Sequence, residues 1–310
     1  MDILLKAESA DADAQDVKVD EISYSPGGSA SNCAAIAGSL GQPVTFIGTI
    51  GNDSWTEPLL NDFRGFNINA RYVKRSQGMT GTCVSVVDDA GERKFYSYRG
   101  VNEVDPPGVP PESVWKKHHC LQLSGYSFQQ PNSRQTAWSM LRTAKRNGLD
   151  VSLDPSYLFA KQTGSEMDEL LAHLDFMFPN LVEAELLSGE QDPVKAARVL
   201  RGRGVGTILV TLGSDGCLLS SKDNEVFIRI DPLEKVVDTT GAGDAICGGF
   251  LTGWLKGLSS IQACKLGCAA AAHIVTCMGA HEKAPTLTDL MNILRHNHEI
   301  ELVNLIENLS

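Results

Sequence analysis

The sequence lacks an apolar run long enough to cross a membrane, and its first residues do not resemble a signal peptide. It contains no stretch of about 18 apolar residues, and its start, MDILLKAESADADAQD, is acidic where a signal peptide is basic and then apolar. At 310 residues with 42% hydrophobic residues, the chain can build one large α/β domain or two smaller ones. We therefore expect a globular, cytoplasmic protein without a membrane partner.

The cysteines and histidines show no disulfide framework and no metal motif. Eight cysteines are scattered along the chain without any CxxC, and Cys264 and Cys268 have no partners at zinc-finger spacing. The seven histidines form no HExxH motif. We expect reduced thiols, and we expect any metal to be held by oxygen atoms.

Basic residues are the minority. The chain has 27 Lys and Arg against 38 Asp and Glu, which gives a formal charge of −11. Because duplex affinity comes mainly from Lys and Arg on phosphates, this balance argues against a nucleic-acid partner and favours a small-molecule ligand.

Short β-prone runs alternate with helical runs along most of the chain. Helical patterns at 30–41, 56–67 and 134–148 alternate with β-prone patterns at 43–51 and 149–156. Such alternation predicts a parallel sheet, and ligands of open parallel sheets bind beyond the carboxyl ends of the strands. The polar residues at predicted strand ends are Asp154, Asn180 with Glu183, Thr211 with Gly213, and residues 238–244.

The alternation pauses between residues 70 and 100. Two β-prone runs there are joined by Asp88-Asp89-Ala90-Gly91, which is a hairpin signal. Together with the β-prone run at 16–27 they could form a small separate sheet that covers a site as a lid, or an edge extension of the main sheet. We expect a single domain over 1–310 with a lid inserted from about 9–25 and 71–101.

The stretch DTTGAGDAICGGF, Asp238 to Phe250, predicts an anion site. The loop Gly241-Ala242-Gly243 lets backbone amides approach a ligand at the start of a helix, and Asp244 is the reactive group beside it. A carboxylate beside a bound anion is costly unless it accepts a proton from a nucleophile that attacks that anion. The alternative is a plain helix-capping turn. GxxxxGK[ST] is absent, and the spacing does not fit GxGxxG.

The helix that follows shows an apolar stripe and two internal glycines. Ile246, Phe250, Trp254 and Leu258 recur every four residues, so we expect them in the core. Gly248 and Gly249 each cost about 1 kcal/mol relative to Ala, which we attribute to close packing of the helix against the sheet.

The segment SPGGSASNCA predicts a second polar ligand contact. Gly27 and Gly28 precede a helix, and Asn32 offers both a donor and an acceptor to a pair of hydroxyl groups. The alternative is an ordinary tight turn and helix start.

Taken together, these segments resemble the PfkB, or ribokinase-like, family of carbohydrate kinases over nearly the whole chain. GGSASNCA resembles the first signature of the family and DTTGAGDAICGGF the second, and PNLVEAE, TLGSDG and AAAAHIVTCMGA follow the order of the other blocks. The resemblance implies a three-layer α/β/α core with a mostly parallel sheet, a small β-sheet lid, and ATP-dependent phosphorylation of an alcohol.

The resemblance also implies roles for single residues. Asp244 matches the catalytic base, and Gly241, Ala242 and Gly243 match the anion hole. Further matches concern the two substrates and the ions: Asn180, Thr211 and Gly213 on the nucleotide side, Glu183 for Mg²⁺ through water, Gly28, Asn32 and Asn102 on the sugar side, and Asp238, Thr240, Gly279 and Ala280 for K⁺.

The start of the chain departs from the family pattern. Members usually begin with an apolar strand that leads to a substrate-binding Asp, and here Met1 directly precedes Asp2. We carry Asp2 over as the sugar-binding carboxylate, with an exposed terminal residue as the alternative. The missing strand predicts a shortened form of reduced stability.

The acceptor remains open. No cluster of cationic residues accompanies Arg99, so we expect an unphosphorylated sugar. Phe95, Tyr96 and Tyr98 could instead provide an aromatic slot for a nucleoside, and a non-catalytic ligand sensor is a third hypothesis. An exposed small sheet with apolar faces predicts a homodimer formed through the lid.

Overall fold

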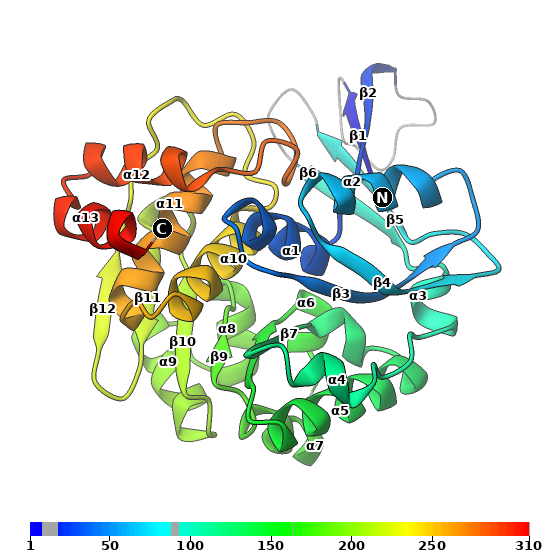
Figure 1. Cartoon of the computed structure of the whole chain (residues 1–310), viewed down its shortest axis with the longest axis horizontal. Helices are drawn as coiled ribbons and strands as arrows, with labels where there is room; N and C mark the ends of the chain where they lie inside the picture. Colours follow the sequence, from blue (N-terminus) through cyan, green and yellow to red (C-terminus); the bar gives the residue numbers. More distant parts are fainter. Residues whose placement is uncertain (8–17, 88–92, 163, 310) are drawn as a thin grey trace. The chain divides into compact units, whose positions relative to one another are not determined.

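A computed structural model describes residues 1–7, 18–87, 93–162 and 164–309 (Figure 1). The chain forms two compact units, the first comprising Met1–Gly28 with Thr45–Gly108 and the second Ser29–Val44 with Val109–Ser310. Across the described ranges, every helix is too short or too polar to cross a membrane. All eight cysteines are free, as the sequence predicts.

The first unit contains a small four-stranded sheet in the order β2-β1-β5-β6. Its strands are β1 (Asp2–Ala7), β2 (Val19–Ser25), β5 (Thr82–Val87) and β6 (Arg93–Tyr98). β1 pairs antiparallel with β2 and parallel with β5, and β5 pairs antiparallel with β6. The small sheet expected from the sequence is therefore present, with β1 as a member that the sequence did not predict. The expected hairpin turn at 88–91 and lid residues 9–17 lie outside the described residues, and the lid bounds stay a prediction.

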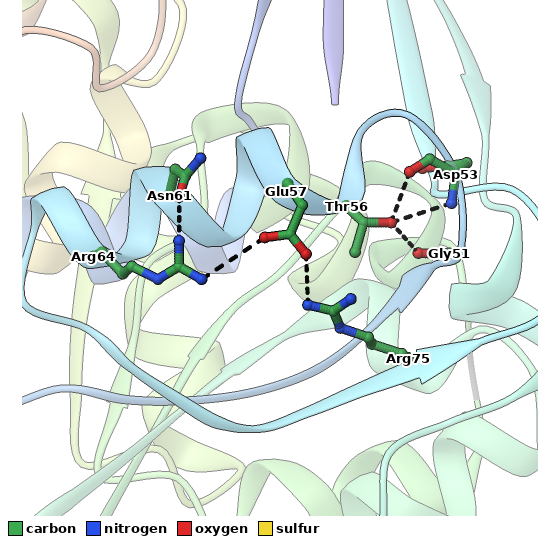
Figure 2. Close-up of polar contacts among 7 residues, drawn as sticks. All are labelled: Gly51, Asp53, Thr56, Glu57, Asn61, Arg64 and Arg75. Carbon is green, nitrogen blue, oxygen red and sulfur yellow. Dashed lines mark hydrogen bonds and ion pairs between the residues drawn. The ribbon is translucent and has the colours of Figure 1, made fainter.

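The first unit also holds a parallel pair, β3 (Thr45–Gly51) and β4 (Asn69–Ser76), joined by α2 (Thr56–Gly65), and the short helix α3 (Val101–Val104). Figure 2 shows how Thr56 fastens the start of α2 to the end of β3. Its buried Oγ1 donates to the carbonyl of Gly51 at 2.6 Å and accepts from the amide of Asp53 at 3.1 Å. Glu57 then binds Arg75 of β4 at 2.7 Å, so the first turn of α2 is tied to both strands.

The second unit is built on a six-stranded, mostly parallel sheet in the order β12-β11-β10-β9-β8-β7. β7, β8, β9 and β10 run parallel, and β11 and β12 add an antiparallel edge. The bounds are β7 (Cys120–Ser124), β8 (Asp150–Asp154), β9 (Phe176–Met177), β10 (Thr207–Thr211), β11 (Cys217–Ser220) and β12 (Glu225–Ile228).

Helices cover both faces of this sheet. In β10, Leu209 belongs to the large apolar cluster that includes α10 (Ala242–Leu255) and α11 (Ser260–Ile274), whereas Ile208 and Val210 point to the opposite face and are equally buried. Burial on both faces is typical of the parallel sheet in a three-layer α/β/α core. The remaining helices are α1 (Ser29–Ser39), α4 (Glu112–Trp115), α5 (Pro131–Arg146), α6 (Tyr157–Ala160), α7 (Ser165–Leu171), α8 (Leu181–Ser188), α9 (Pro193–Gly202), α12 (Leu287–His296) and α13 (Ile300–Leu309), with short 3₁₀ turns at Gly125–Phe128 and Gly213–Asp215.

The packing of α10 corrects one expectation. Its stripe residues Ile246 and Phe250 are buried, as predicted, but its two internal glycines do not pack on the sheet. A Cβ on Gly248 would lie 2.8 Å from the carbonyl oxygen of Cys33 in α1, and one on Gly249 would lie 2.8 Å from the Cα of Gly267 in α11. The glycines therefore serve close helix–helix contacts, because α10 lies between two other helices.

Candidate functional site

Polar residues lie at the carboxyl ends of three neighbouring parallel strands in the second unit. Asp154 ends β8, Asn180 follows β9, and Thr211 ends β10. Asn180 and Thr211 form a parallel bridge beyond the named strands, and the amide of Thr211 donates to the carbonyl of Pro179 at 2.9 Å. The sheet thus holds these positions next to one another.

Asn180 and Glu183 form a reciprocal cap at the start of α8. Oδ1 of Asn180 accepts from the amide of Glu183 at 2.9 Å, and Oε2 of Glu183 accepts from the amide of Asn180 at 3.0 Å. This capping box fixes the buried Glu183 carboxylate beside the strand ends. The pair therefore has a structural role in addition to any role toward an ion.

The start of α10 has no side-chain cap. Gly241 occupies the cap position with a φ of +80° and has no side chain with which to cap the helix. A Cβ on Gly241 would lie 2.6 Å from the carbonyl oxygen of Ala280, so this glycine is needed for both conformation and space. A Cβ on Gly243 would meet nothing within 4 Å. The helix therefore presents its first amide groups and an open space above Gly243.

Two hydrogen bonds link α1 to the carboxylates of this site. Nδ2 of Asn32 donates to Oδ2 of Asp244 at 2.7 Å, and Oγ of Ser29 donates to Oδ2 of Asp154 at 2.5 Å. The sequence placed Asn32 on the sugar side, and its buried amide here contacts the predicted base. Ser29 was not predicted.

Asp154, Glu183 and Asp244 form a cluster of carboxyl groups. Burial, with a smaller contribution from the negative charge of Glu183, raises the pKa of Asp154 to about 7, although hydrogen bonds with Ser29 and Asp244 oppose the shift. Burial likewise raises the pKa of Glu183 to about 7, with a further contribution from the charge of Asp244. The site therefore carries an excess of negative charge that a cation would relieve.

We expect these two groups to make the protein less stable as the pH rises from about 5 to 7. Their folded pKa values near 7 lie above the ordinary values near 4, so the folded state binds more protons in this window. Each titrating group should lower the free energy of unfolding by about 1 kcal/mol per pH unit. Denaturant titrations at several pH values measure the slope. Asp154→Asn should reduce it, and an unchanged slope in that variant would contradict the prediction.

Asp238 joins the loop before α10 to the loop after α11. Its buried carboxylate accepts from the amide of Thr240 at 2.8 Å and from the amide of Gly279 at 3.1 Å. Together with the contact of Gly241 and Ala280, these bonds bring all four positions predicted for K⁺ into two adjoining loops.

Of the remaining predicted residues, Gly213 begins the 3₁₀ turn after β10 in the second unit, and the others lie in the first unit. Asp2 begins β1 and is half-buried, so it is not an exposed terminal residue. A Cβ on Gly27 would lie 2.0 Å from Oδ2 of Asp2. Position 27 therefore needs a glycine, because the Asp2 carboxylate approaches its backbone closely. Asn102 lies in α3, with Nδ2 2.5 Å from the position of a Cβ on Gly81. In the parallel ladder of β1 and β5, Asp2 lies opposite Cys83, two residues beyond Gly81 in the sequence.

Besides Ser29, two residues of the second-unit site were not in the predicted set. Asp154 stood at a predicted strand end without a role, and His281 had no signal beyond following Gly279 and Ala280 in the sequence. Nδ1 of the buried His281 lies 2.7 Å from Oδ1 of Asn32, 249 positions away in sequence, a separation that local patterns do not show.

Comparisons with known proteins show the family to which the chain belongs. The family model described as pfkB family carbohydrate kinase matches residues 1–287. A ribokinase of Haemophilus influenzae is 34% identical over 89% of this chain and 89% of its own. Among solved structures, a ribokinase of Thermotoga maritima is 28% identical with a TM-score of 0.81, covering 95% of this chain and 96% of its own. The adenosine kinase of Sinorhizobium meliloti is 27% identical with a TM-score of 0.79, covering 90% and 85%. The chain is therefore a member of the pfkB family of carbohydrate kinases, phosphotransferases that act on sugar hydroxyl groups.

Proposed function

We propose that this kinase transfers the γ-phosphoryl group of ATP to a hydroxyl group of an unphosphorylated sugar. Asp244 takes the proton of the hydroxyl as its oxygen forms a bond to phosphorus, and the bond to the leaving ADP oxygen breaks. The amides of residues 241–244 bind the negative charge that develops on the transferred group. From the family resemblance we assign Asn180, Thr211 and Gly213 to nucleotide binding, and Asp2, Gly28, Asn32 and Asn102 to sugar binding.

The observation that carries this proposal is the juxtaposition at the start of α10. An uncapped helix terminus with open space above Gly243 lies beside a carboxylate held by Asn32. The helix terminus attracts an anion, whereas the carboxylate repels one unless it serves as a proton acceptor. A base and an anion site in direct contact are what in-line phosphoryl transfer requires.

Mg²⁺ fits the carboxyl cluster when bound through water. Burial, followed by repulsion between neighbouring carboxylates, raises the pKa values of Asp154 and Glu183, and a hard divalent ion nearby would stabilise their charged forms. Within the described ranges no three carboxylate, thiol or imidazole groups are placed to ligate a metal directly. We therefore propose that Glu183 orients water molecules of the ion. Mg²⁺ supplies charge neutralisation at the phosphates.

We propose a K⁺ site formed by backbone oxygens of the two loops that Asp238 joins, at Asp238, Thr240, Gly279 and Ala280. The support is the close contact of these loops beside the first turn of α10. A cation there would stabilise the loop that presents the anion-binding amides.

A coupled ADP-release assay tests the proposed function. MgATP is combined with D-ribose, other pentoses, hexoses, sugar acids and nucleosides, in KCl or NaCl, with Asp244→Ala as the blank. We expect turnover with one sugar, D-ribose being the first to try because of the ribokinase relatives, and faster turnover in KCl. A folded protein that releases no ADP with any acceptor would overturn the proposal and favour a ligand-binding role.

A nucleoside is the second candidate acceptor. Tyr96 and Tyr98 lie two residues apart on β6, so they share one face of the small sheet, and both are more than half exposed, at 56% and 57%. Such a face could stack on a base. Turnover with nucleosides and not with sugars in the same assay would favour this alternative.

We also propose a homodimer formed through the small sheet, in the cytoplasm. The sheet exposes Ile22 and Tyr24 on β2 in addition to the two tyrosines of β6, an apolar surface that a second copy would cover. Eight free cysteines are suited to a reducing compartment.

A further inference from the structure

His281 is a fully buried histidine with a polar partner in the site. Its side chain is 0% exposed, and Nδ1 lies 2.7 Å from Oδ1 of Asn32, which is itself only 4% exposed. Asn32 in turn donates from Nδ2 to Oδ2 of Asp244 at 2.7 Å. The three side chains form a continuous hydrogen-bonded chain from the loop after α11, through α1, to α10.

The chemistry of the asparagine fixes the direction of both bonds. An amide oxygen only accepts, so Nδ1 of His281 carries a proton and donates to it. If the amide were turned by 180°, its oxygen would face the Asp244 carboxylate, and two acceptors would be in contact. The Asp244 carboxylate therefore selects the amide orientation, and His281, by donating from Nδ1 to Oδ1, holds the Asn32 amide in it.

The loop that carries His281 is held firmly relative to α10. The amide of Gly279 is bound by Asp238, Ala280 packs against Gly241, and the carbonyl of His281 accepts from the amide of Ala284 at 2.9 Å. The loop thus holds the imidazole in place, and the imidazole can hold the amide of Asn32 in one orientation.

We propose that His281 is a positioning residue for phosphoryl transfer: it orients the Asn32 amide, which in turn holds the Asp244 carboxylate in the geometry required of the base. The inference rests on the proposed function, in which Asp244 is that base. His281 touches neither substrate in this role, so its loss should lower kcat and leave ATP binding unchanged, whereas the KM for the sugar also reports on the Asn32 amide, which we place on the sugar side.

Steady-state kinetics with MgATP and D-ribose, or the sugar that the acceptor panel identifies, test the inference. The wild type and Asp244→Ala are measured first, so failure of the proposed function is seen separately. His281→Leu is then expected to lower kcat by about 10-fold or more, with the KM for ATP within about 2-fold of the wild type. His281→Asn, which places a donor near the position of Nδ1, should restore most of the kcat.

A double-variant cycle separates positioning from general stability. In an Asn32→Ala background, His281→Leu should cause no further loss of kcat, because the connection to Asp244 is already broken. Equal fold-losses with and without Asn32 would overturn the inference, as would wild-type kcat in the leucine variant. If the leucine variant does not fold, His281→Gln is compared with His281→Asn. The longer amide should lose activity that the shorter one keeps, and equal activities would overturn the inference.

Discussion

Replacement of Asp244 by alanine is expected to lower kcat by about 10²–10⁴-fold while nucleotide binding is retained. The carboxylate is the proton acceptor that makes the sugar hydroxyl a nucleophile, and water cannot replace it once the substrates fill the site. ADP release in the coupled assay measures the loss, and calorimetric titration with ATP measures binding. Retention of most of the activity would contradict the assignment of the base.

Asp244→Asn provides the matched control for this experiment. It keeps the shape of the side chain and an oxygen that can accept from Nδ2 of Asn32, so the hydrogen bond at 2.7 Å can persist. It removes only the charge and the basicity. We expect the asparagine variant to be as inactive as the alanine variant and to unfold closer to the wild-type temperature, because alanine leaves the buried Asn32 donor without this acceptor.

Gly243→Ala is expected to separate folding from function. Gly243 has an ordinary helical conformation, and a Cβ there meets no protein atom within 4 Å, so the fold does not require a glycine. Alanine should stabilise the helix by up to about 1 kcal/mol. The methyl group would occupy the space in which we place the transferred phosphoryl group. Displacement of that group by about 1 Å can cost about 100-fold in rate, and the coupled assay and a thermal melt measure both effects.

Two other glycines serve as controls for Gly243→Ala. Gly202, in the last turn of α9, also has open space at its Cβ, so Gly202→Ala should leave turnover unchanged without loss of stability. Gly241→Ala should instead destabilise the protein, because φ is +80° and its Cβ would collide with the backbone of Ala280. Full activity in Gly243→Ala would argue against an anion site at this helix terminus.

The sequence predicts those parts of the site that are formed by residues close together in the chain. The run from Asp238 to Asp244 combines small residues, a helix start and a carboxylate, so both its conformation and its chemistry can be inferred locally. The same holds for Asn180 and Glu183, whose spacing forms the capping box that the structure contains. Glu183, which the family resemblance relates to Mg²⁺, also caps the start of α8.

Features that depend on distant partners were not predictable in the same way. The glycine pair in α10 indicated close packing, but its partners in α1 and α11 follow from tertiary structure alone. The role of β1 in the small sheet depends on parallel pairing with β5, about eighty positions along the chain. His281 is an extreme case, because no local pattern relates it to Asn32. The expectation of a missing upstream strand remains a prediction.

The burial of α10 has a consequence for the movements open to this enzyme. Every residue from Ala245 to Gly253 is buried, and glycines on two sides of the helix bring neighbouring backbones into contact. Dense interiors resist small displacements, so α10 cannot slide or tilt without opening the core of its unit. Asp244, in its first turn, is therefore a stationary member of the site. Any adjustment between substrate entry and product release must be made by groups that approach Asp244, while the base stays where the core holds it.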